Sequence, residues 1–93
     1  IQDYAESVRW YKMAANAGDS LAQYNLGVMY FKGQGILQNY QLAHMWFNIA
    51  AVNGDVDAVK NREITAAKMT PQQIAEAQKL ARECQSRNFK NCD

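Results

Sequence analysis

The chain repeats one of its own segments, and this repetition constrains the fold more than any other feature. The stretch WYKMAANAGD at residues 10–19 returns as WFNIAAVNGD at residues 46–55, a shift of 36 positions. A period of about 20 to 50 residues is typical of solenoids, in which each helix pair buries its apolar face on the next pair. The repetition therefore predicts a stack of similar helical units. The identical pairs are Gln2 with Gln38, Tyr4 with Tyr40, Trp10 with Trp46, Ala14 with Ala50, Ala15 with Ala51, Gly18 with Gly54, Asp19 with Asp55 and Ala22 with Ala58.

Glycines and capping residues divide the chain into five expected helices. Asp3, Asp19, Asn39 and Asp55 are placed to cap four of them, because short polar side chains accept hydrogen bonds from the first amides of a helix. The start of the fifth is marked by Thr-Pro-Gln-Gln at residues 70–73, which combines a capping box with proline at the first helical position. The expected helices cover residues 4–17, 20–32, 40–53, 56–69 and 71–87.

Apolar residues recur at helical spacing in the third, second and fifth of these helices, so each should bury one face. Gly27 in mid-helix costs about 0.5 to 1 kcal/mol relative to alanine, so its expected use is close helix packing. The stripes are Tyr40, Ala43, Trp46, Phe47, Ala50 and Ala51 in the third helix, Ala22, Leu26 and Tyr30 in the second, and Ile74, Ala77, Leu80, Ala81 and Cys84 in the fifth.

The pattern formed by these residues resembles the Sel-one-like repeat, a relative of the tetratricopeptide repeat. It consists of Ala22, Leu26-Gly27, Tyr30, Gly33, Gly35, Asn39-Tyr40, Ala43, Trp46-Phe47, Ala50-Ala51 and Gly54-Asp55. The resemblance implies an all-α fold, an α-α superhelix built as a right-handed solenoid of antiparallel helix hairpins.

On this resemblance, residues 1–93 form a single repeat domain of about two and a half repeats. Residues 1–19 are the second half of a preceding repeat, 20–55 a complete repeat, 56–87 a diverged C-terminal capping repeat and 88–93 a tail. In the capping repeat the pattern would place Leu, Gly and Tyr where this chain has Arg62, Glu63 and Ala66. Polar residues at stacking positions are typical of the end of an array.

The resemblance also implies that the chain is not an enzyme and acts as a scaffold that binds a peptide or another protein on its concave face. Lysines at the edge of an aromatic floor would suit an amphipathic or acidic peptide. Two interpretations of Tyr24 and Phe31 stay open, ligand contact and packing between neighbouring helices. The concave positions are Leu21, Tyr24, Val28, Phe31 and Lys32, with Asp57, Lys60, Ile64, Ala67 and Lys68 in the next repeat.

Residue types that carry chemistry are sparse and scattered. His44 is the only histidine and has no second ligand or paired carboxylate at a useful spacing, so we expect a structural role, no metal and no cofactor. A net charge of +1 argues against a nucleic-acid partner. No run approaches the roughly 18 to 20 apolar residues of a membrane span, so we expect no membrane insertion.

Cys84 and Cys92 are the two cysteines, and a chain that turns back after Asn88 would bring them within disulfide range. The alternative is two reduced thiols. A disulfide favours an oxidising compartment. Because many bacterial members of the resembled family are exported, we expect a periplasmic or secreted location, with the cytoplasm as the alternative.

Two further functions remain as alternatives to the scaffold. One is an accessory module of a cell-envelope protein of the cell-wall or β-lactam-binding kind. Relatives of that kind carry a cysteine pair in every repeat, whereas residues 20–55 contain no cysteine. The other is a structural repeat that self-associates, and the open face of the first helix is where a homo-oligomer would form.

Overall fold

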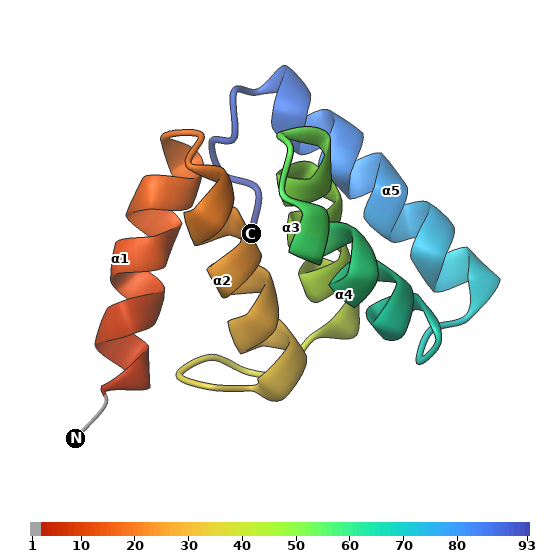
Figure 1. Cartoon of the computed structure of the whole chain (residues 1–93), viewed down its shortest axis with the longest axis horizontal. Coiled ribbons are helices and arrows are strands. Elements are labelled where there is room, and N and C mark those ends of the chain that lie inside the picture. Colours follow the sequence, from red (N-terminus) through yellow and green to blue (C-terminus); the bar gives the residue numbers. More distant parts are fainter. Residues whose placement is uncertain (1–2) are drawn as a thin grey trace.

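The computed structural model describes residues 3–93, and every regular element in this range is an α-helix (Figure 1). The predicted all-α superhelix of five helices is confirmed. Four helices end one to three residues before the predicted position, because the last predicted residues form the cap or the turn. Gln2, a member of the repeat pairs, lies outside the described residues. The helices are α1 (Tyr4–Asn16), α2 (Ser20–Lys32), α3 (Tyr40–Val52), α4 (Val56–Ala66) and α5 (Pro71–Ser86).

All five predicted caps are present at the helix starts. The side chains of Asp3, Asp19, Asn39 and Asp55 each accept a hydrogen bond from the backbone N–H three residues later. At α5 the capping box is complete: Gln73 N–H donates to Thr70 Oγ1 at 3.1 Å, and Thr70 N–H donates to Gln73 Oε1 at 2.9 Å. These bonds satisfy amides that have no partner inside the helix.

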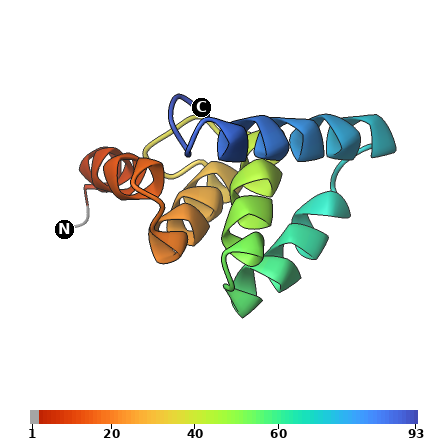
Figure 2. The same cartoon turned by 90° about the horizontal axis from the view of Figure 1, so that it is seen from above.

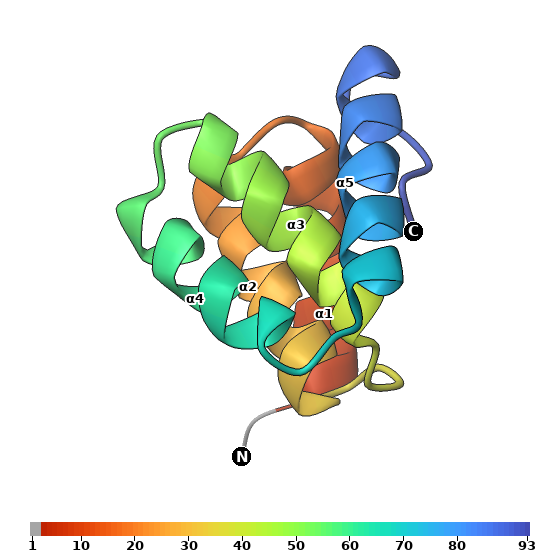
Figure 3. The same ribbon diagram turned by 90° about the vertical axis from the view of Figure 1, so that its right-hand side faces the viewer.

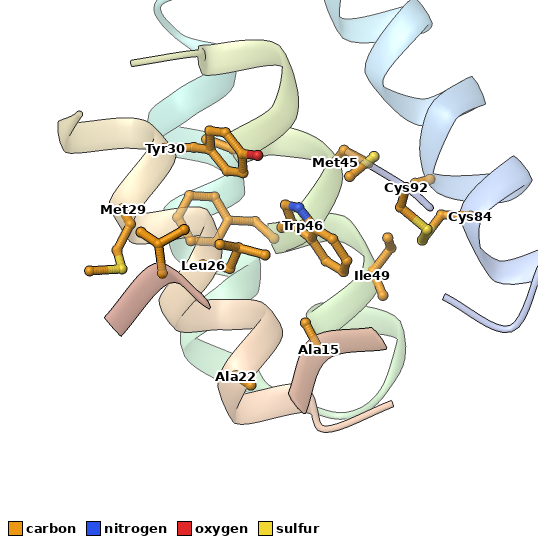
Figure 4. Packing of buried hydrophobic residues seen from close by; sticks show 14 residues of the cluster. Ala15, Ala22, Leu26, Met29, Tyr30, Met45, Trp46, Ile49, Cys84 and Cys92 are labelled. Atoms are coloured by element: carbon orange, nitrogen blue, oxygen red, sulfur yellow. A yellow bond between two sulfur atoms is a disulfide. The ribbon is translucent and has the colours of Figure 1, made fainter. Parts of the chain in front are cut away.

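The core is centred on α3, which packs against α2, α4 and α5. Figure 4 shows Trp46 of α3 between Leu26 of α2 and the disulfide that joins Cys84 of α5 to Cys92, with Ala15 of α1 below it. Trp46 and Phe47 are fully buried. Burying aromatic side chains of this size supplies much of the stabilisation of a small domain.

Helix α5 does not pair with α4 as a regular hairpin would. It packs on α3 instead, and Figure 3 shows α3 between α4 and α5. Two features of the sequence account for this placement. Arg62 and Glu63 make the expected pairing face of α4 polar, and the apolar face of α5, with Ala77, Ala81 and Cys84, is buried on α3.

The tail, residues 88–93, folds back over the first repeat, and Figure 2 shows it running from the end of α5 toward α1. A disulfide joins Cys84 to Cys92 with α carbons 5.1 Å apart. Beyond it, the Asp93 carboxylate accepts a hydrogen bond from the Tyr30 hydroxyl at 2.6 Å and lies 3.8 Å from the Lys12 ammonium. Burial, with the carboxylate beside it, raises the pKa of Tyr30. The tail therefore connects α5 to α1 and α2.

Candidate functional site

A hollow of about 310 Å³ opens between α2 and α4, with α3 as its floor. Five of the ten residues predicted for a concave binding face line it: Tyr24, Val28, Phe31, Lys32 and Ile64. We call this hollow the groove. Its remaining lining residues are Phe47, Asn61 and Thr65.

Helical spacing explains why these residues share one hollow. On α2 the lining positions are 24, 28, 31 and 32, and on α4 they are 61, 64 and 65. Positions three or four apart lie on one face of a helix. Each helix therefore turns one face toward the groove, and Phe47 of α3 closes the space between them.

Tyr24 and Phe31 both pack against α3 and line the groove. The Tyr24 ring lies 5.8 Å from the Phe47 ring with the planes tilted by 49°, and the Phe31 ring lies 5.4 Å from the Tyr40 ring with a tilt of 54°. Tilted aromatic pairs at this separation are favourable beyond their buried area. Both side chains remain half-buried. Helix packing thus accounts for one face of each ring, and ligand contact for the other face stays a prediction.

Hydrogen bonds hold polar side chains in place among the apolar residues of the groove. The Asn61 amide donates to the Tyr24 hydroxyl at 2.7 Å, which ties α4 to α2, and the Thr65 hydroxyl donates to the Asn61 carbonyl at 2.7 Å. Lys32 is exposed at the end of α2, so its ammonium group stands at the rim. The arrangement offers apolar contact area below and a positive charge at the edge.

The other predicted residues lie elsewhere. Leu21 borders a hollow beside Trp10, Lys60 borders one on another side of α4, and Lys68 is exposed after the end of α4. Asp57 and Ala67 are also exposed outside the groove. The 36-residue shift selects the face of α4 that corresponds to the predicted face of α2. A groove between the two helices is instead lined by the sides of α2 and α4 that face each other.

The sequence-based prediction missed Asn61 and Thr65 for this reason, and it assigned Phe47 only to the apolar stripe of its helix. The residues of α4 that face back toward α2 are the counterparts of Asn25, Val28 and Met29 in the preceding repeat. Applying the shift to those positions would have indicated Asn61, Ile64 and Thr65. The repetition therefore contained the information, but its use requires knowing which sides of adjacent helices face each other.

His44 is buried away from the groove and is 2% exposed. Its Nδ1 atom has no hydrogen-bond partner within residues 3–93. Burial, and then the nearby Arg62 guanidinium, lower its pKa. In the described part of the chain, no three His, Cys, Asp or Glu side chains gather as a metal site would need. The structure thus places His44 in the interior, where its neutral form is favoured.

A match to a known repeat establishes the family of this chain. The model of the Sel1 repeat matches residues 1–19 and 20–55, the same two segments that the internal repetition outlines. The chain belongs to the Sel1 repeat family. Sel1 repeats generally mediate protein–protein interactions.

Curated relatives share the Sel1 repeat but are far longer. The chain is 50% identical over 40 residues to a putative sel1-like repeat-containing protein of Acanthamoeba polyphaga mimivirus, a match covering 43% of the chain and 7% of that protein. It is 40% identical over 58 residues to the chitin synthase regulator SKT5 of Saccharomyces cerevisiae, covering 62% of the chain and 8% of that protein. The chain therefore spans less than a tenth of either relative. None of the helices in residues 3–93 has the length and apolarity needed to cross a membrane.

Proposed function

We propose that this Sel1 repeat chain is a non-catalytic interaction module that binds a peptide segment of a partner protein in the groove between α2 and α4. One observation carries the proposal. The groove combines half-exposed aromatic rings held by α3 with an exposed lysine at its rim. Rigid aromatic side chains give contact area at low entropic cost, and they are enriched where binding energy concentrates.

The chemistry of the lining indicates the kind of segment that fits. Val28, Ile64 and the aromatic rings favour one or two apolar side chains, and Lys32 favours an acidic group next to them. The volume of about 310 Å³ is at the lower end for a binding pocket, so we expect one or two anchoring side chains rather than an entire helix.

A peptide-display selection followed by NMR tests this proposal. A random library is panned on the chain, and the strongest binder is titrated while amide signals are recorded. We expect the Asn61 side-chain amide and the backbone of Val28 and Ile64 to shift. Ile64→Lys places a charge on an exposed groove residue without opening the core, so it should abolish binding and preserve the helical circular dichroism.

Tyr24→Phe is the matched control, because it removes only the hydroxyl bonded to Asn61 and keeps the ring. It should retain binding within a few fold, whereas Tyr24→Ala and Phe31→Ala should each weaken it by tenfold or more. Selected peptides whose shifts map outside the groove, or whose affinity survives Ile64→Lys, would reject the proposal.

We further propose that the protein works in an oxidising compartment, as a periplasmic or secreted protein would. The support is the disulfide between Cys84 and Cys92, because such bonds persist mainly outside reducing compartments. This disulfide closes the tail onto α5 and involves no residue of the repeat at 20–55, which favours the interaction module over a cell-envelope accessory role.

A further inference from the structure

The tail, residues 88–93, is bound by the rest of the chain as a separate segment would be. The Phe89 ring packs against Gly18, in the turn between α1 and α2, where a Cβ atom built on Gly18 would lie 3.5 Å from it. Cys92 is only 7% exposed and belongs to the buried core. The tail therefore places two apolar anchors on the body of the molecule.

The charged end of the tail is also enclosed. The Asp93 side chain is 7% exposed, and its carboxylate meets the Tyr30 hydroxyl of α2 and the Lys12 ammonium of α1. A carboxylate removed from water in this way needs such partners, because an unpaired buried charge is costly. We call Lys12, Gly18 and Tyr30 the tail site. This site belongs to α1, α2 and the turn between them, whereas the tail leaves from the end of α5, so the site can hold the tail of any copy that reaches it.

The segment that leads into the tail site has an unfavourable backbone. Asn88, Phe89 and Asn91 have φ angles of 56°, 66° and 56°, in the left-handed region. Side chains disfavour this region, and bulky ones such as phenylalanine most of all. A short strained connection favours exchange of the segment that follows it, because an extended connection relieves the strain. When extended, residues 88–91 span up to about 14 Å, which lets the tail reach a neighbouring copy.

We propose that two copies of this chain exchange their tails. The tail of each copy occupies the tail site of the other, and Cys84 of each copy bonds to Cys92 of the other. The tail makes the same contacts in the closed monomer and in the exchanged dimer, whereas only the dimer lets residues 88–91 extend. Because the exchange is reciprocal, both tail sites are filled and the assembly stops at two copies. None of the contacts that carry the proposal involves a groove residue, so it is independent of the proposed function.

A small monothiol such as glutathione catalyses the exchange without net oxidation or reduction. Its thiolate attacks the Cys92 sulfur, which forms a mixed disulfide and releases Cys84 as a thiolate. The Cys84 thiolate of a second copy then attacks the same Cys92 sulfur, which forms the bond between copies and expels the monothiol. Because both cysteines are buried, the tail must open before the first attack. A tail on a short connection meets its own site at an effective concentration of about 1 mM, so we expect exchange near this protein concentration.

Two cysteine variants provide the test. Cys84→Ser keeps only the cysteine of the tail, and Cys92→Ser keeps only that of α5, so neither can close the bond within one chain. The two are mixed in equal amounts at about 1 mM in a glutathione buffer, and mass spectrometry identifies the linked peptides. Random pairing would give Cys84–Cys92 bonds as often as the two symmetric bonds together. We expect about tenfold more Cys84–Cys92 bonds than symmetric ones, because the tail site brings only this pair together.

Lys12→Glu, introduced into the Cys92→Ser variant, tests whether the tail site directs the bond. It places a second carboxylate beside Asp93 of the incoming tail, so it should reduce the Cys84–Cys92 bonds several fold. Lys60→Glu is the matched control, since Lys60 is an exposed lysine of α4 outside the tail site, and it should leave the yield unchanged. Circular dichroism checks that the variants fold, with alanine in place of serine as a second pair of cysteine variants.

The unmodified chain gives an independent measurement. Isotope-labelled and unlabelled chains are refolded together at about 1 mM with glutathione, and Cys84–Cys92 bonds should join labelled to unlabelled chains in a dimer. Asn91→Pro excludes the left-handed conformation and should increase the dimer, whereas Asn91→Gly adopts that conformation freely and should decrease it. Closed monomers alone, symmetric bonds in the random proportion, or an equal yield with and without Lys12→Glu would each overturn the proposal.

Discussion

Replacing Gly27 by alanine tests the close approach of α2 and α3 on which the stack depends. A Cβ atom built on Gly27 would lie 2.7 Å from Cε1 and 2.8 Å from Cδ1 of Phe47. Phe47 is fully buried and its ring packs against Tyr24, so it has little room to move. The added methyl group must therefore displace a packed ring or separate the two helices.

Two opposing effects determine whether Gly27→Ala raises or lowers the free energy of unfolding. Alanine in mid-helix is about 0.5 to 1 kcal/mol better than glycine, because glycine loses more conformational freedom on folding. Overpacking a close-packed core costs about 1 to 3 kcal/mol. The structure makes the second effect the larger one, so we expect Gly27→Ala to lower the free energy of unfolding by about 1 to 2 kcal/mol.

A double-mutant cycle with Phe47→Leu separates the two effects. Urea unfolding followed by circular dichroism gives the free energies, and Phe47→Leu removes ring atoms that crowd position 27. In that background Gly27→Ala should become neutral or stabilising, with a coupling energy of about 1 to 3 kcal/mol. If Gly27→Ala stabilises the chain with Phe47 intact, or costs the same in both backgrounds, the close packing inferred here is wrong.

Three other predictions concern the tail, the buried histidine and the mobility of α4. Cys92→Ser, or reduction, should lower the unfolding free energy by about 2.5 kcal/mol, since the bond closes a loop with a sequence separation of 8; two thiols that label freely in the unreduced native protein would contradict it. Because burial lowers the pKa of His44, the unfolded chain binds more protons than the folded chain near pH 6. The free energy of unfolding should therefore fall as the pH drops below about 6.5. His44→Gln should remove this dependence of stability on pH. Hydrogen exchange should be faster in α4, with two buried residues, than in α3, with seven; equal protection of the two helices would refute this.

Local signals in the sequence were strong enough to define the helices. Each helix start carries its own chemical mark, such as Asp19 or the Thr70 capping box, and caps act over three residues. The repetition then related the helices to each other, because equal sequences in equal surroundings pack alike. Trp46 was placed in the core in this way, and it is fully buried.

The internal repetition could not predict how the surroundings of equivalent residues differ between the two repeated segments. Trp10 matches Trp46 in sequence, yet Trp10 is largely exposed while Trp46 is covered on all sides. The position of α5 and the contact of Asp93 with Tyr30 depend on packing between residues far apart in the sequence. The spacing of residues within a helix does not indicate such contacts. Part of the groove lining was predicted, since Tyr24 and Val28 follow from the face of one helix. Asn61 was missed, because its place in the groove depends on how two helices face each other.

Helix α4 forms one wall of the groove, to which it contributes Asn61, Ile64 and Thr65. Because α5 packs on α3, α4 is held mainly by α3 and by the hydrogen bond from the Asn61 amide to the Tyr24 hydroxyl of α2. The width of the groove therefore depends on how α4 packs against α3, and on the bond between Asn61 and Tyr24.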